Sequence, residues 1–128
     1  MTLDEQRKHF SKFIKKMDRT MLKKGSDYAG QDRLSNFKLS GQITQTSAEI
    51  NCLNLIATKV ARLGILLHSN KVNNESISDS ILDLANYAIL LDQLIHDKEN
   101  SRKLREPRRK GATKGNVSTD YGAESYCS

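Results

Sequence analysis

Three acidic side chains and an asparagine form a polar row along the segment from Glu75 to Leu91. Glu75, Asp79 and Asp83 are spaced four residues apart and Asn86 continues the row, so on an α-helix all four lie on one strip. Like charges at this spacing repel one another. The row therefore requires a counter-charge, either a divalent cation held by the three carboxylates or a facing basic group.

The helix that carries this row is apolar around most of its remaining circumference, which predicts extensive burial. Its apolar positions are Ile77, Ile81, Leu82, Leu84, Ala85, Ala88, Ile89 and Leu91. We expect the helix to run from about residue 75 to 95, with a charged continuation before Pro107.

Two further helices are predicted upstream. Thr2 and Glu5 form a capping box for a helix from about residue 3 to 24 that ends at Gly25. Thr46 and Glu49 form a second one for a helix from about residue 47 to 68. We expect the Gly- and Ser-rich stretch between them to be a long functional loop.

The second predicted helix has an apolar face and a lysine that departs from it. The apolar face consists of Ile50, Leu53, Ala57, Val60, Gly64 and Leu67, and Asn51, Asn54, Thr58 and Arg62 form the polar one. Lys59 falls on an apolar flank beside Leu55, Leu66, Cys52 and Leu63. Its ammonium either reaches solvent along the helix surface or reaches the acidic row.

Length and composition favour one small, all-α domain. The chain has 128 residues, 37% hydrophobic residues, no Trp and one Pro. Continuous apolar runs are shorter than a membrane span, and no basic-then-apolar leader opens the chain. We therefore expect a cytoplasmic protein without a membrane segment. Cys52 is expected to be a core thiol and Cys127 an exposed one.

The charge of +6 is unevenly distributed. Residues 1–24 carry eight basic and three acidic side chains, residues 25–97 five and eight, and residues 98–128 eight and four. The basic ends either form solvated faces or bind nucleic acid weakly and without sequence specificity. Residues 101–128 are expected to be a disordered basic tail outside an all-α domain of residues 1–100.

Common catalytic signatures are absent. The chain has no phosphate-binding glycine loop, no dinucleotide fingerprint, no H-E-x-x-H pair and no nucleophile elbow. His9, His68 and His96 fall on three separate predicted helices, which argues against a histidine metal site. The acidic row, Lys59 and the loop containing Asp27 and Tyr28 are the remaining candidates for a site.

Three segments in this order resemble the small phage and prophage proteins of the nucleotide modification associated domain 1 family. They are Lys24 to Gly30 leading to Asn36-Phe37, Lys59 to Leu63, and Glu75 to Ala88. The resemblance covers roughly residues 10–95. It implies a phage-type protein that binds or processes nucleotides in the cytoplasm of a bacterial host.

That family is more remotely similar to the MazG-type all-α pyrophosphohydrolases, in which four carboxylates from two helices hold Mg²⁺ against a nucleoside triphosphate. Asp83 and Tyr87 match the last acidic residue and the tyrosine of that pattern. Ser80 stands where a glutamate is expected, and Lys59 and Arg62 stand where the first acidic pair falls. The resemblance therefore implies a MazG-like helical bundle but departs from the metal-binding pattern.

Two hypotheses follow from the resemblance. In the first, the protein is a Mg²⁺-dependent nucleotide phosphohydrolase with Asp83, Asp79 and Lys59 in catalysis and Glu75, Asp79 and Asp83 on the metal. In the second, it binds or sequesters a nucleotide or nucleotide signal without chemistry. The residues implied to contact the nucleotide are Asp27, Tyr28, Asn36, Phe37, Lys59, Arg62, Asn86 and Tyr87.

A structural alternative remains open for the acidic row. Asp79 and Asp83 can pair with Lys59, Arg62 or basic residues of the first helix and so fix the relative position of the helices. The apolar surface also exceeds what one monomer of three such helices can bury, so we expect a homodimer or higher oligomer that completes a four-helix type of core.

Overall fold

The structure is a computed structural model of the chain, and it describes residues 1–28, 32–69 and 74–106. These residues form four helices and no strand, which confirms the all-α class. The helices are α1 (Leu3–Tyr28), α2 (Ser35–Thr44), α3 (Ala48–His68) and α4 (Asn74–Arg105). Three helices were predicted, and the structure adds α2, because part of the expected loop is helical.

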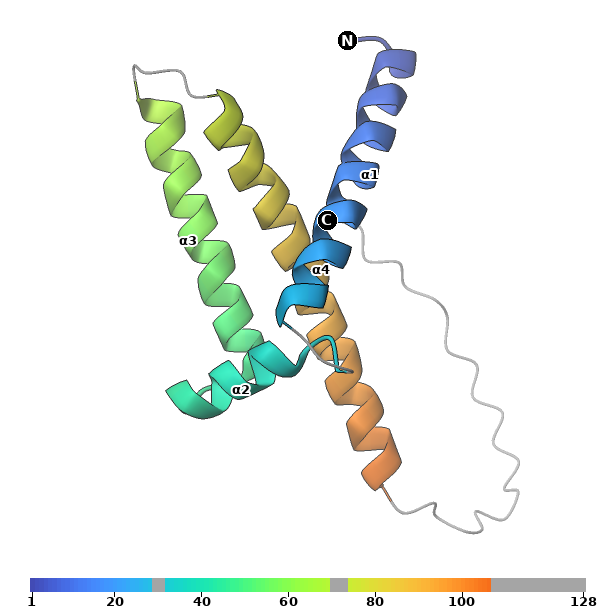
Figure 1. Cartoon of the computed structure of the whole chain (residues 1–128), viewed down its shortest axis with the longest axis vertical. Coiled ribbons are helices and arrows are strands. Elements are labelled where there is room, and N and C mark those ends of the chain that lie inside the picture. Colours follow the sequence, from blue (N-terminus) through green and yellow to red (C-terminus); the bar gives the residue numbers. More distant parts are fainter. Residues whose placement is uncertain (29–31, 70–73, 107–128) are drawn as a thin grey trace, which may run out of the picture.

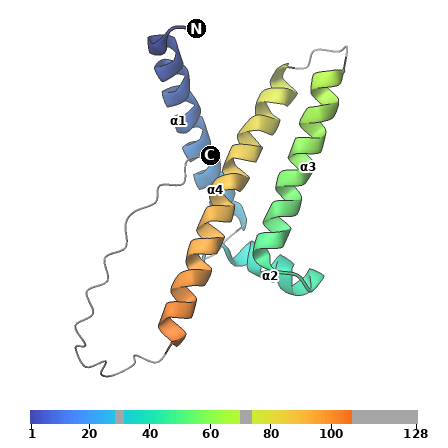
Figure 2. The ribbon, with the colours of Figure 1, turned by 180° about the vertical axis from the view of Figure 1, so that it is seen from behind.

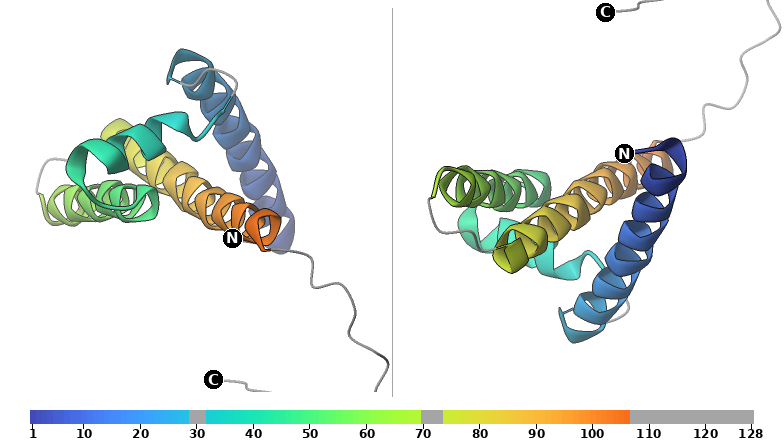
Figure 3. Two further views of the ribbon diagram at one scale, coloured as in Figure 1. Left: turned by 90° about the horizontal axis from the view of Figure 1, so that it is seen from below. Right: turned by 90° about the horizontal axis from the view of Figure 1, so that it is seen from above.

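Helices α3 and α4 form an antiparallel hairpin that is the centre of the fold (Figure 1). Helix α2 packs on α3. Helix α1 runs in the same direction as α4, contacts it through its C-terminal half, and diverges from it toward the N-terminus (Figures 1 and 2). Both α1 and α2 lie on one side of the hairpin (Figure 3).

The ends of α1 differ in how well the sequence predicts them. The capping box is confirmed: the Thr2 amide donates to Glu5 Oε2 at 2.7 Å, and the Glu5 amide donates to Thr2 Oγ1 at 3.3 Å. The predicted stop at Gly25 is wrong, because the helix continues to Tyr28. A glycine within a helix is tolerated at a modest cost when the flanking residues continue the backbone hydrogen bonds.

Helix α3 begins at Ala48, one residue later than predicted. Ser47 is the N-cap residue, and its hydroxyl accepts a hydrogen bond from the Ile50 amide at 3.1 Å. The predicted cap, Thr46, instead donates its hydroxyl hydrogen bond to the Asn51 side chain at 3.1 Å. Both residue types cap well, so the backbone path into the helix decides between them.

Helix α2 is held against the hairpin by close backbone packing and by one lysine. A Cβ added to Gly41 would lie 3.0 Å from both the Ala48 amide nitrogen and the Thr46 carbonyl oxygen. The ammonium of Lys38 pairs with Asp32 at 2.7 Å and with Asp97 of α4 at 2.9 Å. These contacts connect the segment before α2 to the second half of α4.

The core is small. Leu34, Cys52 and Leu94 form its buried cluster, and Leu82 is buried nearer the N-terminus of α4. Partly buried residues pack around the cluster: Phe37, Ala48, Tyr87, Leu90 and Leu91. The prediction of a core thiol at Cys52 is confirmed, whereas Cys127 lies outside the described residues.

The predicted apolar face of α3 does not point into this core. Ile50, Leu53, Val60 and Leu67 are exposed, whereas Cys52 and the ammonium of Lys59 face α4. The interpretation of the six-residue face as the buried one is therefore wrong for a single copy of the chain. Periodicity shows which residues share a face, but not which neighbour the face meets.

Helix α4 includes the charged continuation that was predicted before Pro107. It extends through residue 100, the expected end of the domain, to Arg105, so the first residues of the predicted tail are helical. The remainder of that tail lies outside the described residues. The last turn of α4 is basic, with Arg102, Lys103 and Arg105, which suits the negative end of a helix dipole.

Helix α3 also has the length and composition of a membrane-spanning helix, with a mean hydropathy of 1.5 over its most apolar window. Core helices of soluble proteins meet the same criterion. In this chain the helix carries Lys59, which forms an ion pair with α4.

Candidate functional site

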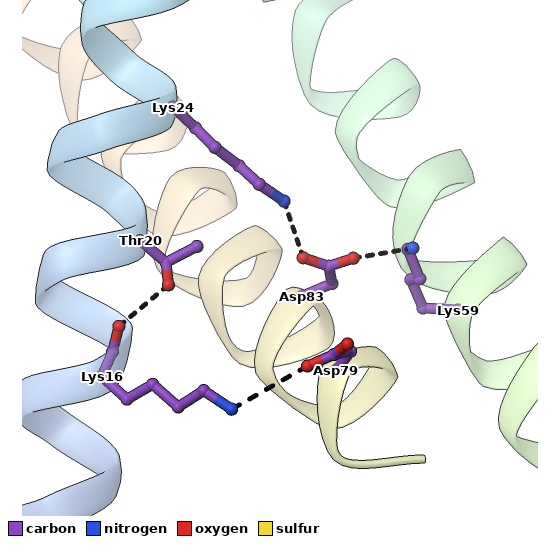
Figure 4. A network of polar contacts seen from close by, with 6 residues as sticks. All are labelled: Lys16, Thr20, Lys24, Lys59, Asp79 and Asp83. Carbon is purple, nitrogen blue, oxygen red and sulfur yellow. Dashed lines mark hydrogen bonds and ion pairs between the residues drawn. The ribbon is translucent and has the colours of Figure 1, made fainter. Parts of the chain in front are cut away.

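Asp83 is the centre of an ionic cluster between three helices. Its Oδ1 accepts a hydrogen bond from Lys24 Nζ of α1 at 2.8 Å, and its Oδ2 lies 2.8 Å from Lys59 Nζ of α3 (Figure 4). The side chains of Asp83 and Lys59 are each 20% exposed, whereas that of Lys24 is about half exposed. Of the two alternatives left open for Lys59, the structure therefore shows the second, in which its ammonium reaches the acidic row.

The environment of Asp83 favours its ionised form. Partial burial raises the pKa of the carboxyl group, but the hydrogen bonds and charges of Lys24 and Lys59 outweigh this effect, so the pKa lies below its ordinary value. Asp83 is therefore an anion at neutral pH, with an ammonium on each oxygen.

A second, looser pair lies one turn earlier on α4. Asp79 Oδ1 is 3.8 Å from Lys16 Nζ, and both side chains are largely exposed. Figure 4 shows Lys16, Thr20 and Lys24 following one another along the face of α1 that looks toward Asp79 and Asp83. The two pairs are eight residues apart on α1 and four residues apart on α4, and together they tie the C-terminal half of α1 to α4.

The other members of the predicted row take different positions. Arg62 donates a hydrogen bond from Nη2 to Ser76 Oγ at 2.8 Å, so it contacts α4 through a hydroxyl rather than through a carboxylate. Glu75 is exposed and makes no ion pair with another described residue. Among the described residues, three lysines, Lys16, Lys24 and Lys59, thus pair with the two carboxylates Asp79 and Asp83, and Arg62 lies at the edge of the cluster.

The arrangement does not fit the expected Mg²⁺ site. Among the described residues, no three acidic, histidine or cysteine side chains are grouped so that they could hold a metal ion. Mg²⁺ requires oxygen ligands, but both oxygens of Asp83 are held by ammonium groups. A metal on Asp83 would have to displace two ammonium groups.

Asn86 is buried without hydrogen-bond partners. Its residue exposure is 6%, and neither the amide nitrogen nor the amide oxygen has a partner within the described part of the chain. It lies on α4 one turn after Leu82 and three residues after Asp83. Leaving such a group unpaired costs about 1–3 kcal/mol, so the environment of Asn86 calls for a further polar partner.

The remaining predicted site residues do not join the cluster. Asn36 is exposed on α2. Phe37 and Tyr87 pack against the core, and the Tyr87 carbonyl accepts a hydrogen bond from Cys52 Sγ at 3.4 Å. The side chains of Asp27 and Tyr28 lie outside the described ones. The structure therefore brings together Lys59, Asp79 and Asp83, with Arg62 at the edge.

Lys16 and Lys24 were not among the predicted site residues. The signal for them was present, because Lys16, Thr20 and Lys24 recur every four residues just as Asp79 and Asp83 do. Many lysines line α1, however, and only the packing of α1 on α4 selects these two.

Comparison with known proteins does not add a relative. No family model matches the chain, and no curated protein and no solved structure matches it.

Proposed function

We propose that the protein is a phage-type, cytoplasmic nucleotide-binding protein that holds the phosphates of its ligand with Lys24, Lys59 and Arg62. The observation that carries this proposal is the pair of cations at Asp83, where Lys24 and Lys59 lie 2.8 Å from the two oxygens of one carboxylate. A phosphate group presents the same kind of oxygens with more charge.

In this proposal Asp83 keeps the two ammonium groups close together until the ligand arrives. Lys24 is about half exposed, so its side chain can turn from the carboxylate toward a phosphate. The less exposed Lys59 keeps its position beside Asp83. The amide of Asn86 then supplies both a donor and an acceptor to a polar part of the ligand. Tyr28 or Phe37 is proposed to stack on the base, and a MazG-like bundle is part of the same proposal.

A thermal-shift panel of nucleosides and of their mono-, di- and triphosphates, measured in EDTA and in Mg²⁺, tests this function. We expect phosphorylated ligands to raise Tm in EDTA and to be recovered intact, and the unphosphorylated nucleosides to have no effect. Lys59→Met should abolish the shift. Lys8→Met is the matched control, because within the described part of the chain Lys8 pairs with Asp4 on the exposed surface of α1, away from Asp83. A panel without any shift would contradict the proposal.

A Mg²⁺-dependent nucleotide phosphohydrolase is the second candidate, and the exposure of Asp79 and Glu75 favours it. Asp79 is 3.8 Å from its nearest described cation, and Glu75 has no described ion pair. Release of phosphate or pyrophosphate that requires Mg²⁺, and that is lost in Asp79→Ala, would establish this candidate over the first. Hydrolysis that Asp79→Ala leaves unchanged would show that the activity does not depend on this site.

The basic ends support an additional proposal of weak nucleic-acid binding. Arg7, Lys8, Lys12 and Lys15 line one surface of α1, and the last turn of α4 is basic. Such contacts are sensitive to salt and insensitive to sequence. We expect retention on DNA at low salt to fall when residues 107–128 are deleted, without a change in the nucleotide-induced shift; unchanged retention would contradict a role for that segment.

A further inference from the structure

One side of the α3–α4 hairpin, which we call the bare side, carries no other helix among the residues that the structure describes. Both views in Figure 3 place α1 and α2 together on the other side, and the described residues put no element on this one. The ionic cluster of Asp83 involves α1, so it does not belong to the bare side. The two sides of the hairpin can therefore have separate roles.

The bare side is lined by two apolar rows, one from each helix, which we call the hairpin face. Leu53, Val60 and Leu67 recur every seven residues on α3, and Ile81, Ala88 and Ile95 do so on α4. All six are exposed. Because Lys59 is opposite Asp83 in the antiparallel pair, Val60 falls beside Ile81 and Leu53 beside Ala88. Rotation about each helix by 100° per residue turns both rows away from α1.

The hairpin face is mainly apolar, with one exposed carboxylate, Asp92, one turn after Ala88 on α4. Neither row contains an ionisable residue. The two cations of α3 are turned elsewhere, with Lys59 on Asp83 and Arg62 on Ser76. A nucleic acid or an acidic peptide would find no counter-charge here, whereas a second apolar face of the same shape would be complementary.

Gly64 adds a geometric argument. A Cβ at this position would meet no atom within 4 Å, so packing within the chain gives no reason for a glycine inside α3, where glycine is unfavourable. Gly64 and Ala57 lie seven residues apart at the edge of the hairpin face. Small residues at this spacing allow a second helix to approach closely.

The dimensions of the hairpin face match an interface. By the register of the Lys59–Asp83 pair, the two rows lie side by side over one heptad, and Leu67 and Ile95 extend the patch at opposite ends. Each row is about 21 Å long and about 10 Å wide, which gives roughly 400 Å² in projection. Monomers rarely expose a larger contiguous apolar patch. Stable complexes bury about 800 Å² of accessible surface per partner, which is of the same order once the relief of the side chains is included.

We propose that the hairpin face is the contact surface for a second copy of this chain. Two hairpins pack face to face into a four-helix bundle, and each copy keeps α1 and its ionic cluster on the outside. This association does not depend on nucleotide binding, because the two surfaces lie on different sides of the hairpin. It can therefore fail while the proposed function holds, and the reverse is also true.

Light scattering of the full chain without nucleotide tests the proposal. We expect the wild type to have at least twice the mass of one 14.4 kDa chain, and Val60→Glu to have the mass of one chain. Ile65→Glu is the matched control, because it makes the same change on α3, outside the hairpin face, at a residue that is 73% exposed against 53% for Val60. Ala88→Glu repeats the test from α4, and circular dichroism shows that each variant remains helical.

Several outcomes would overturn the proposal. The first is a light-scattering mass of the wild type that equals that of one chain. The second is a decrease in mass that is the same for Val60→Glu as for the control Ile65→Glu. The proposal is also contradicted if Val60→Glu and Ala88→Glu both lose their helical signal in circular dichroism while their soluble fractions keep the wild-type mass. Flotation of the wild-type chain with neutral phosphatidylcholine vesicles, lost in Val60→Glu, would assign the face to a lipid bilayer instead.

Discussion

Asp83 and Lys59 lie across the α3–α4 hairpin with 2.8 Å between Oδ2 and Nζ, and each side chain is 20% exposed. They are separated by 24 positions in the sequence but lie opposite each other on the two antiparallel helices. Lys24 takes the other oxygen of the carboxylate. A single side chain of α4 therefore connects all three long helices.

The first prediction concerns the energy of this pair. We expect a double-mutant cycle of Asp83→Asn and Lys59→Met to give a coupling energy of about 1–2 kcal/mol, between the values for exposed and buried ion pairs. Urea unfolding measures it. The matched cycle of Asp4→Asn and Lys8→Met, at a pair that is largely exposed, should give no measurable coupling. Equal coupling in both cycles would contradict the central position of Asp83.

The second prediction concerns acid. The pKa of Asp83 is lowered in the folded chain by Lys24 and Lys59, against the effect of burial, and the pKa of Glu49 is lowered chiefly by the hydrogen bond from Lys98. The unfolded chain then binds more protons than the folded chain, so these groups stabilise the fold above about pH 4, and this stabilisation is lost as the pH falls further.

Urea midpoints measured between about pH 2.5 and 6 test this linkage. Asp83→Asn should flatten the acid limb of the stability curve, because one of the groups that must be protonated is gone. A variant with the wild-type slope would show that Asp83 titrates alike in both states.

The third prediction concerns the buried amide of Asn86. Asn86→Leu removes two polar atoms that have no partner and keeps a similar volume, so we expect the free energy of unfolding to rise by about 1–2 kcal/mol. The nucleotide-induced shift in Tm should decrease in the same variant if the amide binds the ligand. Asn100→Leu, at an exposed position of α4, controls for helix propensity. Destabilisation by Asn86→Leu would show that the amide is satisfied in solution.

The fourth prediction concerns the packing of α2. Gly41→Ala would place a Cβ 3.0 Å from backbone atoms of Thr46 and Ala48, which cannot move as easily as the end of a side chain. We expect a loss of about 1–3 kcal/mol. Ser40→Ala, at the neighbouring position of the same helix, is the control and removes only its hydrogen bond with Asn51. A smaller effect for Gly41→Ala than for Ser40→Ala would indicate that α2 can shift away from α3.

The helical elements were largely predictable because their signals are local. The capping box of Thr2 and Glu5, the end of α3 at His68 and the burial of Cys52 follow from residue types and spacings within one or two turns. Helix α2 was missed because its segment, with Gly41 inside it and serines around it, reads as a loop. The segment forms a helix because this conformation lets Leu34 and Phe37 pack on the core.

The sequence by itself determined that the chain is helical, that Glu75, Asp79, Asp83 and Asn86 share one strip, and that Lys59 is out of place on an apolar flank. Only the tertiary structure decided which cations pair with the carboxylates. Lys24 and Asp83 are 59 residues apart and come together through the packing of α1 on α4. The tertiary structure also decided that the apolar rows of α3 and α4 point outward. The physical reason is the same in both cases: helical periodicity fixes which side chains share a face, whereas the packing of whole helices fixes what each face meets.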